Sequence, residues 1–240
     1  MQAHHMSSCV VQSDSLSDVM LHLHAQRVAA QSLQSTGCLL MIAPIYAGFN
    51  EDCSKDNHCY ADAQDAADAS GDAAACLREF ASCVEALRSR DVKVWVHVPQ
   101  DSLVTPDAHF PNNWLSTYAG HAASLGGTIC VHSMRWPSRR LERRDAVIHS
   151  LTSPCPPLTR ALYVTRNDLS KGEDEEGGIL EGTGSLVLDR VSRRAFVARS
   201  QRSEAAAAQS WAVLHGCFRM IRAARLAVII EVLQVFAAAV

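Results

Sequence analysis

The sequence predicts an α/β fold, and two pairs of segments carry that prediction. A helical stretch at residues 72–88 runs directly into a strand-like stretch at residues 91–98. Further along, a candidate hairpin at residues 185–198 is followed by a candidate helix at residues 203–217. Helices and strands that alternate at such short intervals are typical of mixed α/β packing.

The first helix and its strand differ in hydrophobic period. Asp72 is a favourable N-cap, and Arg88 and Arg90 stand near the negative end of the helix dipole. In the stretch DVKVWVHV at residues 91–98, every second residue is valine, which is the period of a strand. The apolar positions of the helix, which keep a helical period, are Cys76, Leu77, Phe80, Cys83, Val84 and Leu87.

The later hairpin and helix follow the same logic. The hairpin at residues 185–198 is expected to turn near residues 191–194. The helix at residues 203–217 is expected to turn Trp211 and Leu214 inward. The other predicted elements are a strand at residues 128–132 and a helix at residues 141–151.

Composition bounds the class of protein and its partners. A chain of 240 residues that is 48% hydrophobic and 20% charged can bury the core of one large or two small domains. The net charge of -3 provides no general attraction to nucleic acid or to an anionic membrane, so neither is expected as a partner. The nine cysteines contain no C-x-x-C pair, which predicts reduced thiols in a cytoplasmic protein without a zinc site.

Both ends of the chain stand apart from its middle. Residues 1–34 carry four histidines amid serine and glutamine, and a disordered extension is expected there. At the other end, residues 222–240 form a divergent apolar tail. Its segment 226–240 is interrupted by Glu231 and Gln234 and is short for a membrane span, so a buried strand or helix is the simpler interpretation.

Familiar cofactor motifs lack their required spacing. The acids Asp62, Asp65, Asp68 and Asp72 do not follow the order of a calcium loop. The stretch EGTGS at residues 181–185 has one Gly-x-Gly without the third glycine of a dinucleotide fingerprint. We therefore expect no metal and no organic cofactor.

Several longer stretches occur in an order that resembles the guanidine-modifying superfamily. This superfamily contains arginine deiminases, amidinotransferases and dimethylarginine dimethylaminohydrolases. The closest resemblance is to citrulline-associated, amidinotransferase-like hydrolases with a P-D-A-x-F-P-N-N-W signature, and it covers roughly residues 37–221. The stretches are PIYAGFNEDCSKDNHCY (44–60), TPDAHFPNNWLSTY (105–118), PSRRLERR (137–144), DLS (168–170), LEGTGSLVLDR (180–190) and SQR (200–202).

The resemblance implies a set of substrate-binding residues around an arginine-like amino acid. Asp107 matches the family acid near the α-amino group of the substrate. Asn112 and Asn113 stand where dimethylarginine hydrolases carry acids that hold the guanidinium. Because both are neutral here, a neutral ureido or otherwise altered substrate stays open. Turn capping is the alternative role of these asparagines.

Further along, the resemblance implies one catalytic acid and a carboxylate clamp. Glu181 matches the family acid that pairs with the guanidine nitrogens or orients the catalytic histidine. Arg139 or Arg140, together with Arg202, matches arginines that bind the substrate carboxylate, a role suited to a bidentate guanidinium. Ordinary surface charge is the alternative for the arginines.

The family reaction uses a cysteine thiolate that attacks the guanidine carbon and a histidine that shuttles protons. Beyond about Ile221 the sequence matches neither family motif, and His215 with Cys217 is a poor substitute. We therefore expect impaired catalysis and a chain cut short. The alternative is a non-catalytic relative that binds an arginine-like amino acid or a partner protein.

The fold implied by the resemblance is a fivefold pseudosymmetric α/β propeller of ββαβ units, here incomplete at its C terminus. Residues 35–221 would form this partial domain. Missing units would leave sheet edges open, which favours association. An incomplete domain and one that recruits a partner, such as a second copy in a homo-oligomer, both remain open.

Overall fold

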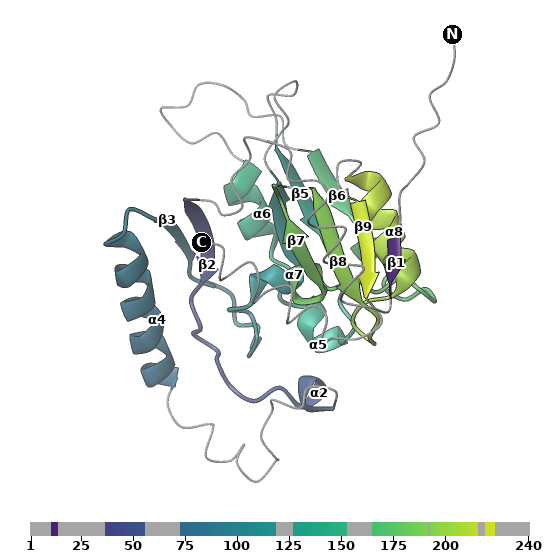
Figure 1. The fold of residues 1–240 in the computed structure, drawn as a ribbon. Coiled ribbons are helices and arrows are strands. Elements are labelled where there is room, and N and C mark those ends of the chain that lie inside the picture. Colours follow the sequence, from purple (N-terminus) through teal and green to yellow (C-terminus); the bar gives the residue numbers. More distant parts are fainter. Residues whose placement is uncertain are drawn as a thin grey trace. The chain divides into compact units, whose positions relative to one another are not determined.

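The computed structural model describes residues 11–13, 37–55, 73–118, 127–152, 165–191, 193–215 and 219–223, and it has a mixed α/β fold with small sheets (Figure 1). Contacts between Cα atoms divide the chain into two compact units. The Asp107 unit comprises Ser35–Ile129 and Met134–Thr165, and the Glu181 unit comprises Met1–Gln34, Cys130–Ser133 and Arg166–Val240. Each unit is described by itself below.

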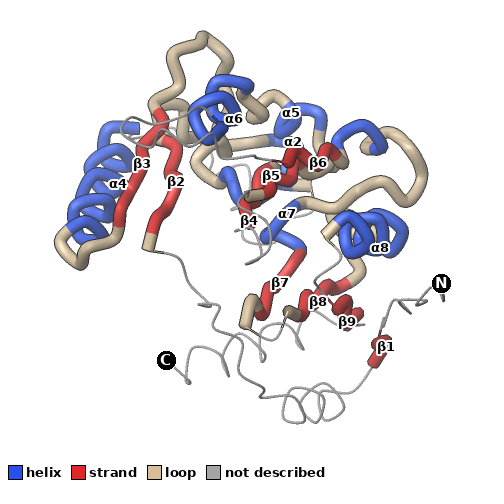
Figure 2. Tube along the Cα trace, turned by 90° about the horizontal axis from the view of Figure 1, so that it is seen from above, coloured by secondary structure: helices blue, strands red, loops and turns tan. Residues whose placement is uncertain are grey.

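The Asp107 unit begins with a β-α-β arrangement. Strands β2 (Cys38–Ile42) and β3 (Lys93–His97) are parallel, with Cys38 opposite Lys93 and Ile42 opposite His97. Helix α4 (Ala73–Arg88) packs along β3 (Figure 2). The remaining elements of this unit are α2 (Glu51–Ser54), the 3-10 helix η1 (Pro111–Asn113), β4 (Leu115–Tyr118), α5 (Pro137–Arg140) and α6 (Asp145–Thr152).

The predicted helix 72–88 and the strand that follows it are confirmed. The strand begins at Lys93 rather than at Asp91, because Asp91 has a φ of 62° and ends the helix in a left-handed conformation. The Val92 N–H then donates to the Leu87 carbonyl at 3.2 Å, which satisfies an orphan carbonyl of the last helical turn.

The Glu181 unit contains a four-stranded sheet in the order β1-β9-β8-β7. Strands β7 (Leu186–Asp189) and β8 (Arg194–Ala198) form the predicted hairpin, which turns through Arg193 at a φ of 52°. Helix α8 (Ala205–Leu214) leads to β9 (Arg219–Ala223), which lies parallel to β8. Two strands, a helix and a strand parallel to the second make one ββαβ unit.

Strand β1 (Val11–Ser13) lies within the segment that was expected to be disordered. It runs parallel to β9, with Val11 opposite Ile221. The expectation of a disordered extension at residues 1–34 stays a prediction. The rest of residues 1–34 and the tail from residue 224 lie outside the described residues.

A second sheet repeats the order of elements. Strands β4, β5 (Thr128–Val131) and β6 (Thr165–Asp168) are arranged as β4-β5-β6, and α5 and α6 come between β5 and β6 in the chain. The strand predicted at residues 128–132 is confirmed. The predicted helix 141–151 begins only at Asp145, since α5 ends at Arg140 and a turn separates the two helices. The other short helices are η2 (Ser170–Gly172) and α7 (Gly182–Ser185).

The core of each unit contains one fully buried tryptophan. Trp114, at the end of η1, and Trp211, on α8, both have no exposed surface. The expectation that Leu214 also turns inward is wrong, since Leu214 is 51% exposed. The buried row of α8 repeats at intervals of four residues through Ala207, Trp211 and His215, and Leu214 falls outside this row.

No helix among the residues described here has the length and apolar run needed to cross a membrane. The apolar segment 226–240 lies outside those residues, so its predicted burial stays a prediction.

Candidate functional site

The signature stretch at residues 105–118 folds as successive turns that lead into β4. The Ala108 N–H donates to the Thr105 carbonyl at 3.1 Å, and the Phe110 N–H donates to the Asp107 carbonyl at 2.9 Å. Pro111 then opens η1, a position where its missing N–H costs nothing. These turns bury Asp107 and Asn113, which are 5% and 6% exposed.

The two adjacent asparagines have different surroundings. Asn113 is buried, whereas Asn112 is exposed. Successive residues of a 3-10 helix point about 120° apart, so the two amides cannot face the same point. The structure thus brings Asn113, but not Asn112, to the interior next to Arg139.

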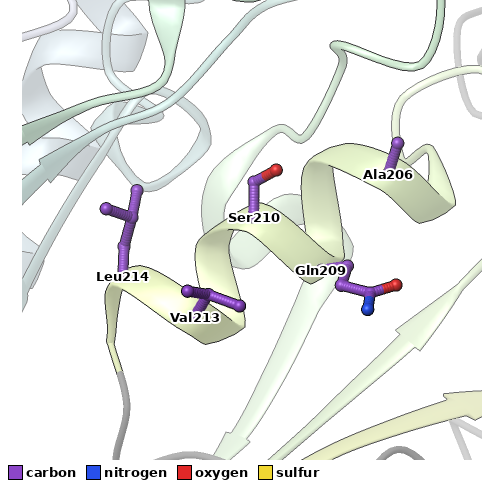
Figure 3. A pocket seen from close by; sticks show the side chains of 5 residues that line it. All are labelled: Ala206, Gln209, Ser210, Val213 and Leu214. Atoms are coloured by element: carbon purple, nitrogen blue, oxygen red, sulfur yellow. The ribbon is translucent and has the colours of Figure 1, made fainter. Parts of the chain in front are cut away.

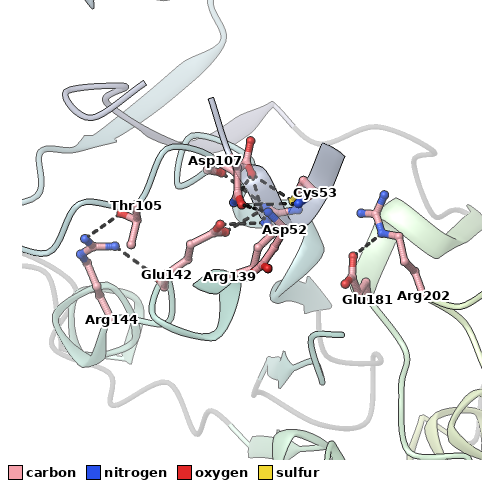
Figure 4. Close-up of polar contacts among 10 residues, drawn as sticks. Asp52, Cys53, Thr105, Asp107, Arg139, Glu142, Arg144, Glu181 and Arg202 are labelled. Atoms are coloured by element: carbon pink, nitrogen blue, oxygen red, sulfur yellow. Dashed lines mark hydrogen bonds and ion pairs between the residues drawn. The ribbon is translucent and has the colours of Figure 1, made fainter. Parts of the chain in front are cut away.

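The Asp107 carboxylate lies in a buried polar cluster (Figure 4). Its Oδ2 accepts hydrogen bonds from Asn50 Nδ2 at 2.8 Å and from the Cys53 thiol at 3.3 Å, and Arg139 Nε lies 3.8 Å away. The oxygen of the Asn50 amide caps α2 by accepting from the Asp52 and Cys53 N–H groups. Asn50 therefore joins the start of α2 to Asp107.

Arg139 is enclosed by acceptors. Its Nε and Nη2 donate to the two carboxylate oxygens of Glu142 at 2.7 and 2.9 Å. The opposite edge faces Asn113, whose amide oxygen accepts from Nη1 at 2.7 Å and from Nη2 at 3.1 Å when the amide is turned to satisfy both groups. Burial opposes the charged form, but Glu142 and then Asp107 outweigh it and raise the pKa of Arg139.

Arg140 has backbone partners. Its Nε donates to the Met134 carbonyl at 2.9 Å, and its Nη2 lies 3.5 Å from the Arg135 carbonyl oxygen. A guanidinium held in this way fixes the turn before α5. Neither Arg139 nor Arg140 therefore presents an open fork to a ligand in this structure.

The Glu181 unit holds the other two predicted residues together. Arg202 Nε donates to Glu181 Oε2 at 2.5 Å, and Glu181 is completely buried. The Arg202 carbonyl in turn accepts from the Glu181 N–H at 3.0 Å and from Ser185 Oγ at 2.9 Å. No hydrogen bond joins the two Nη atoms of Arg202 to any residue that the structure describes, and this side chain is 31% exposed.

The segment that carries Glu181 is held in place on both sides. The Ile179 N–H donates to Glu204 Oε2 at 2.8 Å, and the Leu180 N–H donates to Ser133 Oγ at 2.7 Å. His132, beside Ser133, is fully buried and contacts the Leu180 backbone. These contacts fix the backbone around Glu181 before any ligand is bound.

Sequence reasoning missed three members of the Asp107 cluster, which are Asn50, Cys53 and Glu142. Asn50 and Cys53 lie in the family stretch at residues 44–60, and Glu142 lies in the stretch at residues 137–144. The stretches were therefore a usable signal, although nothing in them indicates which side chains are buried.

A shallow hollow lies elsewhere in the Glu181 unit, on the exposed side of α8 (Figure 3). It is lined by Ala206, Gln209, Ser210, Val213 and Leu214, none of which belongs to the predicted site. Among the described residues, no group of three or more histidine, cysteine, aspartate or glutamate side chains could hold a metal ion.

Each unit holds buried carboxylates beside an arginine. Asp107 and Glu142 pair with Arg139 in the Asp107 unit, and Glu181 pairs with Arg202 in the Glu181 unit.

Residues 43–226 match the family described as N,N dimethylarginine dimethylhydrolase, eukaryotic. The chain belongs to this family, whose hydrolases act on guanidino or amidino groups. No curated protein sequence is similar enough to the chain to match it.

Three solved structures are similar to the chain, and the first of them, at a TM-score of 0.50, shows the shared fold. A dimethylarginine dimethylaminohydrolase adduct with S-methyl-L-thiocitrulline has a TM-score of 0.50 at 16% identity, over 79% of this chain and 62% of that chain. A Pseudomonas aeruginosa dimethylarginine dimethylaminohydrolase variant complexed with citrulline has a TM-score of 0.47 at 17% identity, over 79% and 62%. A substrate-bound arginine dihydrolase domain from Cyanobacteria has a TM-score of 0.47 at 14% identity, over 77% and 56%. The chain spans between half and two thirds of the length of these structures.

Proposed function

We propose that this chain binds an arginine-like amino acid with the residues that match its family's motifs. At family level the reaction is hydrolysis of a carbon–nitrogen bond of a linear amidine through a covalent cysteine intermediate. Because the residues after Ile221 match neither the family histidine nor the family cysteine motif, we expect little or no turnover from this chain.

We assign the binding residues by their charge and by the hydrogen bonds that they already make within the protein. Asp107 is assigned to the α-amino group, and its buried position strengthens an interaction with a cation. Arg202 is assigned to the α-carboxylate, which its Nη atoms can meet while Nε stays on Glu181. Arg139 and Arg140 are weaker candidates for this role, because both already donate within the protein.

The hydrogen bonds of the Asn113 amide bear on which arginine-like amino acid binds. When the amide is turned so that its oxygen faces Arg139, Arg139 Nη1 and Nη2 occupy both lone pairs of that oxygen. In this orientation Asn113 has only its N–H groups to offer a ligand. A donor suits the carbonyl oxygen of a ureido group and cannot pair with the N–H groups of a guanidinium. This supports L-citrulline over L-arginine as the ligand.

Isothermal titration calorimetry with both amino acids tests this preference. Asn113→Asp adds a second oxygen that can accept from a guanidinium, so we expect the ratio of citrulline to arginine affinity to fall about tenfold, in line with one charge-assisted hydrogen bond. Asn112→Asp adds the same charge at the exposed neighbour and should leave the ratio unchanged. Equal shifts in both variants, or no binding by the wild type, would overturn the proposal.

Turnover is tested separately. The purified 240-residue chain is incubated with arginine, methylated arginines and citrulline, and citrulline or ornithine and ammonia are measured, beside a Cys217→Ser variant. Turnover that this substitution abolishes would show an active enzyme with a substitute nucleophile. Binding without turnover is the expected result. It favours the alternative in which the chain is a non-catalytic relative that binds an amino acid or a partner protein.

The propeller architecture is part of the same proposal. The ββαβ arrangement of β7, β8, α8 and β9 supports a fold built from such units. We propose that residues 35–221 form part of a fivefold propeller built from such units. A crystal structure of the chain tests this, because the units must then repeat around a fivefold pseudosymmetry axis. Light scattering on the purified chain tests whether the chain forms a homo-oligomer.

A further inference from the structure

Two short segments of the Glu181 unit, residues 179–181 and 202–204, pair as an antiparallel ladder. The Glu181 N–H donates to the Arg202 carbonyl at 3.0 Å, and a second backbone hydrogen bond of 2.8 Å joins the other end of the ladder. Glu181 and Arg202 are therefore directly opposite each other. Side chains that are opposite in an antiparallel pair leave it on the same face, so these two meet.

Glu181 holds one edge of the Arg202 guanidinium. Arg202 Nε donates to Glu181 Oε2 at 2.5 Å, and the carboxylate has no exposed surface, whereas the Arg202 side chain is 31% exposed. The Arg202 backbone is fixed as well, because its carbonyl also accepts from Ser185 Oγ at 2.9 Å. Both ends of the Arg202 side chain are thus attached to the segment that carries Glu181.

This attachment leaves the outer edge of the guanidinium to a ligand. Since the group is planar and rigid, holding Nε narrows the directions in which Nη1 and Nη2 can point. In the structure both Nη atoms point away from Glu181 (Figure 4). Two such nitrogens can donate parallel hydrogen bonds to the two oxygens of one carboxylate.

We propose that Glu181 is a positioning residue, which holds Arg202 through Nε so that Nη1 and Nη2 bind the α-carboxylate of the ligand. This inference rests on the proposed function, because it assumes that Arg202 receives the α-carboxylate. It differs from both roles that the resemblance implies for Glu181, which are contact with the substrate guanidine and with a catalytic histidine. An arginine that is already ordered loses less side-chain entropy when the ligand binds.

The charge and the hydrogen bond of Glu181 act on a bound carboxylate in opposite directions. The negative charge repels the carboxylate, whereas the hydrogen bond to Nε orders the guanidinium that receives it. A test of the positioning role must therefore remove the hydrogen bond while the charge stays constant.

The experiment compares two ligands that differ only at the carboxylate. L-citrulline and L-citrullinamide share the ureido and α-amino groups, but only citrulline has a carboxylate. Isothermal titration calorimetry gives the ratio of their affinities for each variant, and changes that affect both ligands alike cancel in this ratio. The wild type should prefer citrulline by about tenfold or more, as expected for charge-assisted hydrogen bonds.

Three substitutions of Glu181 give two pairs of proteins with equal charge. Glu181→Asp keeps the charge of the wild type but withdraws the carboxylate by about 1.5 Å, which puts it out of reach of Nε. Glu181→Gln removes the charge but keeps an oxygen that accepts from Nε, and Glu181→Ala removes both. From the wild type to Glu181→Asp, and from Glu181→Gln to Glu181→Ala, we expect the ratio to fall about fivefold, the effect of ordering one arginine side chain.

Two controls show whether Glu181 acts through Arg202. When Arg202→Ala is added to Glu181→Gln and to Glu181→Ala, the two double variants should have equal ratios, because no guanidinium remains to be positioned. Arg166→Ala removes another arginine of the Glu181 unit, which is exposed and donates to Asp168 at 3.1 Å. This variant should keep the wild-type ratio.

The outcomes separate the two proposals. A wild type that binds neither ligand refutes the proposed function and the inference with it. A wild type that prefers citrulline, together with equal ratios within each pair, refutes only the positioning role, and a difference that persists without Arg202 refutes the claim that Glu181 acts through it. If circular dichroism shows that Glu181→Ala is unfolded, the comparison of the wild type with Glu181→Asp decides.

Discussion

His132 should make the Glu181 unit sensitive to mild acid. Its imidazole has no exposed surface, and burial lowers its pKa to about 3, with a further contribution from nearby His215. The hydrogen bond to the Leu180 backbone acts in the opposite direction but does not outweigh these effects. Folding therefore favours neutral His132, whereas the unfolded chain protonates it near a pKa of about 6.5.

The direction and the size of the effect follow from linkage. Because the folded pKa lies below the unfolded one, the unfolded state binds more protons in this range, and stability falls as the pH drops below about 6.5. Between pH 7.0 and 5.5, a group with an unfolded pKa of about 6.5 and no titration in the folded state removes about 1.3 kcal/mol. Most carboxylates do not yet titrate in this window.

Urea unfolding followed by tryptophan fluorescence measures this loss. The wild type should lose about 1.3 kcal/mol more than His132→Gln between the two pH values, because glutamine does not titrate. His132→Gln can be less stable at both pH values without affecting the comparison, which uses only the change with pH. Equal changes in the two proteins would show that His132 is not buried in its neutral form.

Three further predictions concern packing and reactivity. Trp211→Ala should lower the free energy of unfolding by about 3–5 kcal/mol, whereas Leu214→Ala on the exposed side of α8 should change it by less than about 0.5 kcal/mol, and urea unfolding distinguishes them. Burial, and to a lesser degree Asp168, raises the pKa of Cys130 to about 12, so peptide mass spectrometry should find iodoacetamide on exposed Cys83 and none on Cys130 until urea is added. Gly178→Ala would push a Cβ into a backbone carbonyl oxygen, and we expect a lower melting temperature from a cost of about 1–3 kcal/mol; an unchanged melting temperature would contradict the tight turn before Glu181.

The parts of the fold that depend on local pattern could be predicted from the sequence. The helix ending at Arg88, the valine strand and the hairpin at residues 185–198 each have a period that only one type of element satisfies. Leu214 shows where this reasoning fails. A leucine near the end of a helix fits the apolar pattern, but the packed face of α8 is set by partners that the local sequence does not name.

The candidate site is predictable as a set of residues and not as a set of contacts. Family motifs named Asp107, Asn113 and Arg139, all of which are buried in one cluster. They could not indicate that Asn50 reaches Asp107 across 57 positions of the chain. Nor could they show that Glu142, which in the sequence looks like one more charge in an arginine-rich stretch, is buried.

The contacts change what the motif residues can do. From the sequence, Arg139 is one of several cations able to bind a carboxylate. With Glu142 on one edge and Asn113 on the other, its guanidinium orients other groups and has little left for a ligand. Arg202 keeps its outer nitrogens accessible because its single bond to Glu181 uses only Nε. If ligand recognition follows these contacts, Arg202→Lys should weaken binding of the carboxylate end. Arg139→Lys should instead act through Asn113 and alter the preference between ureido and guanidino ligands.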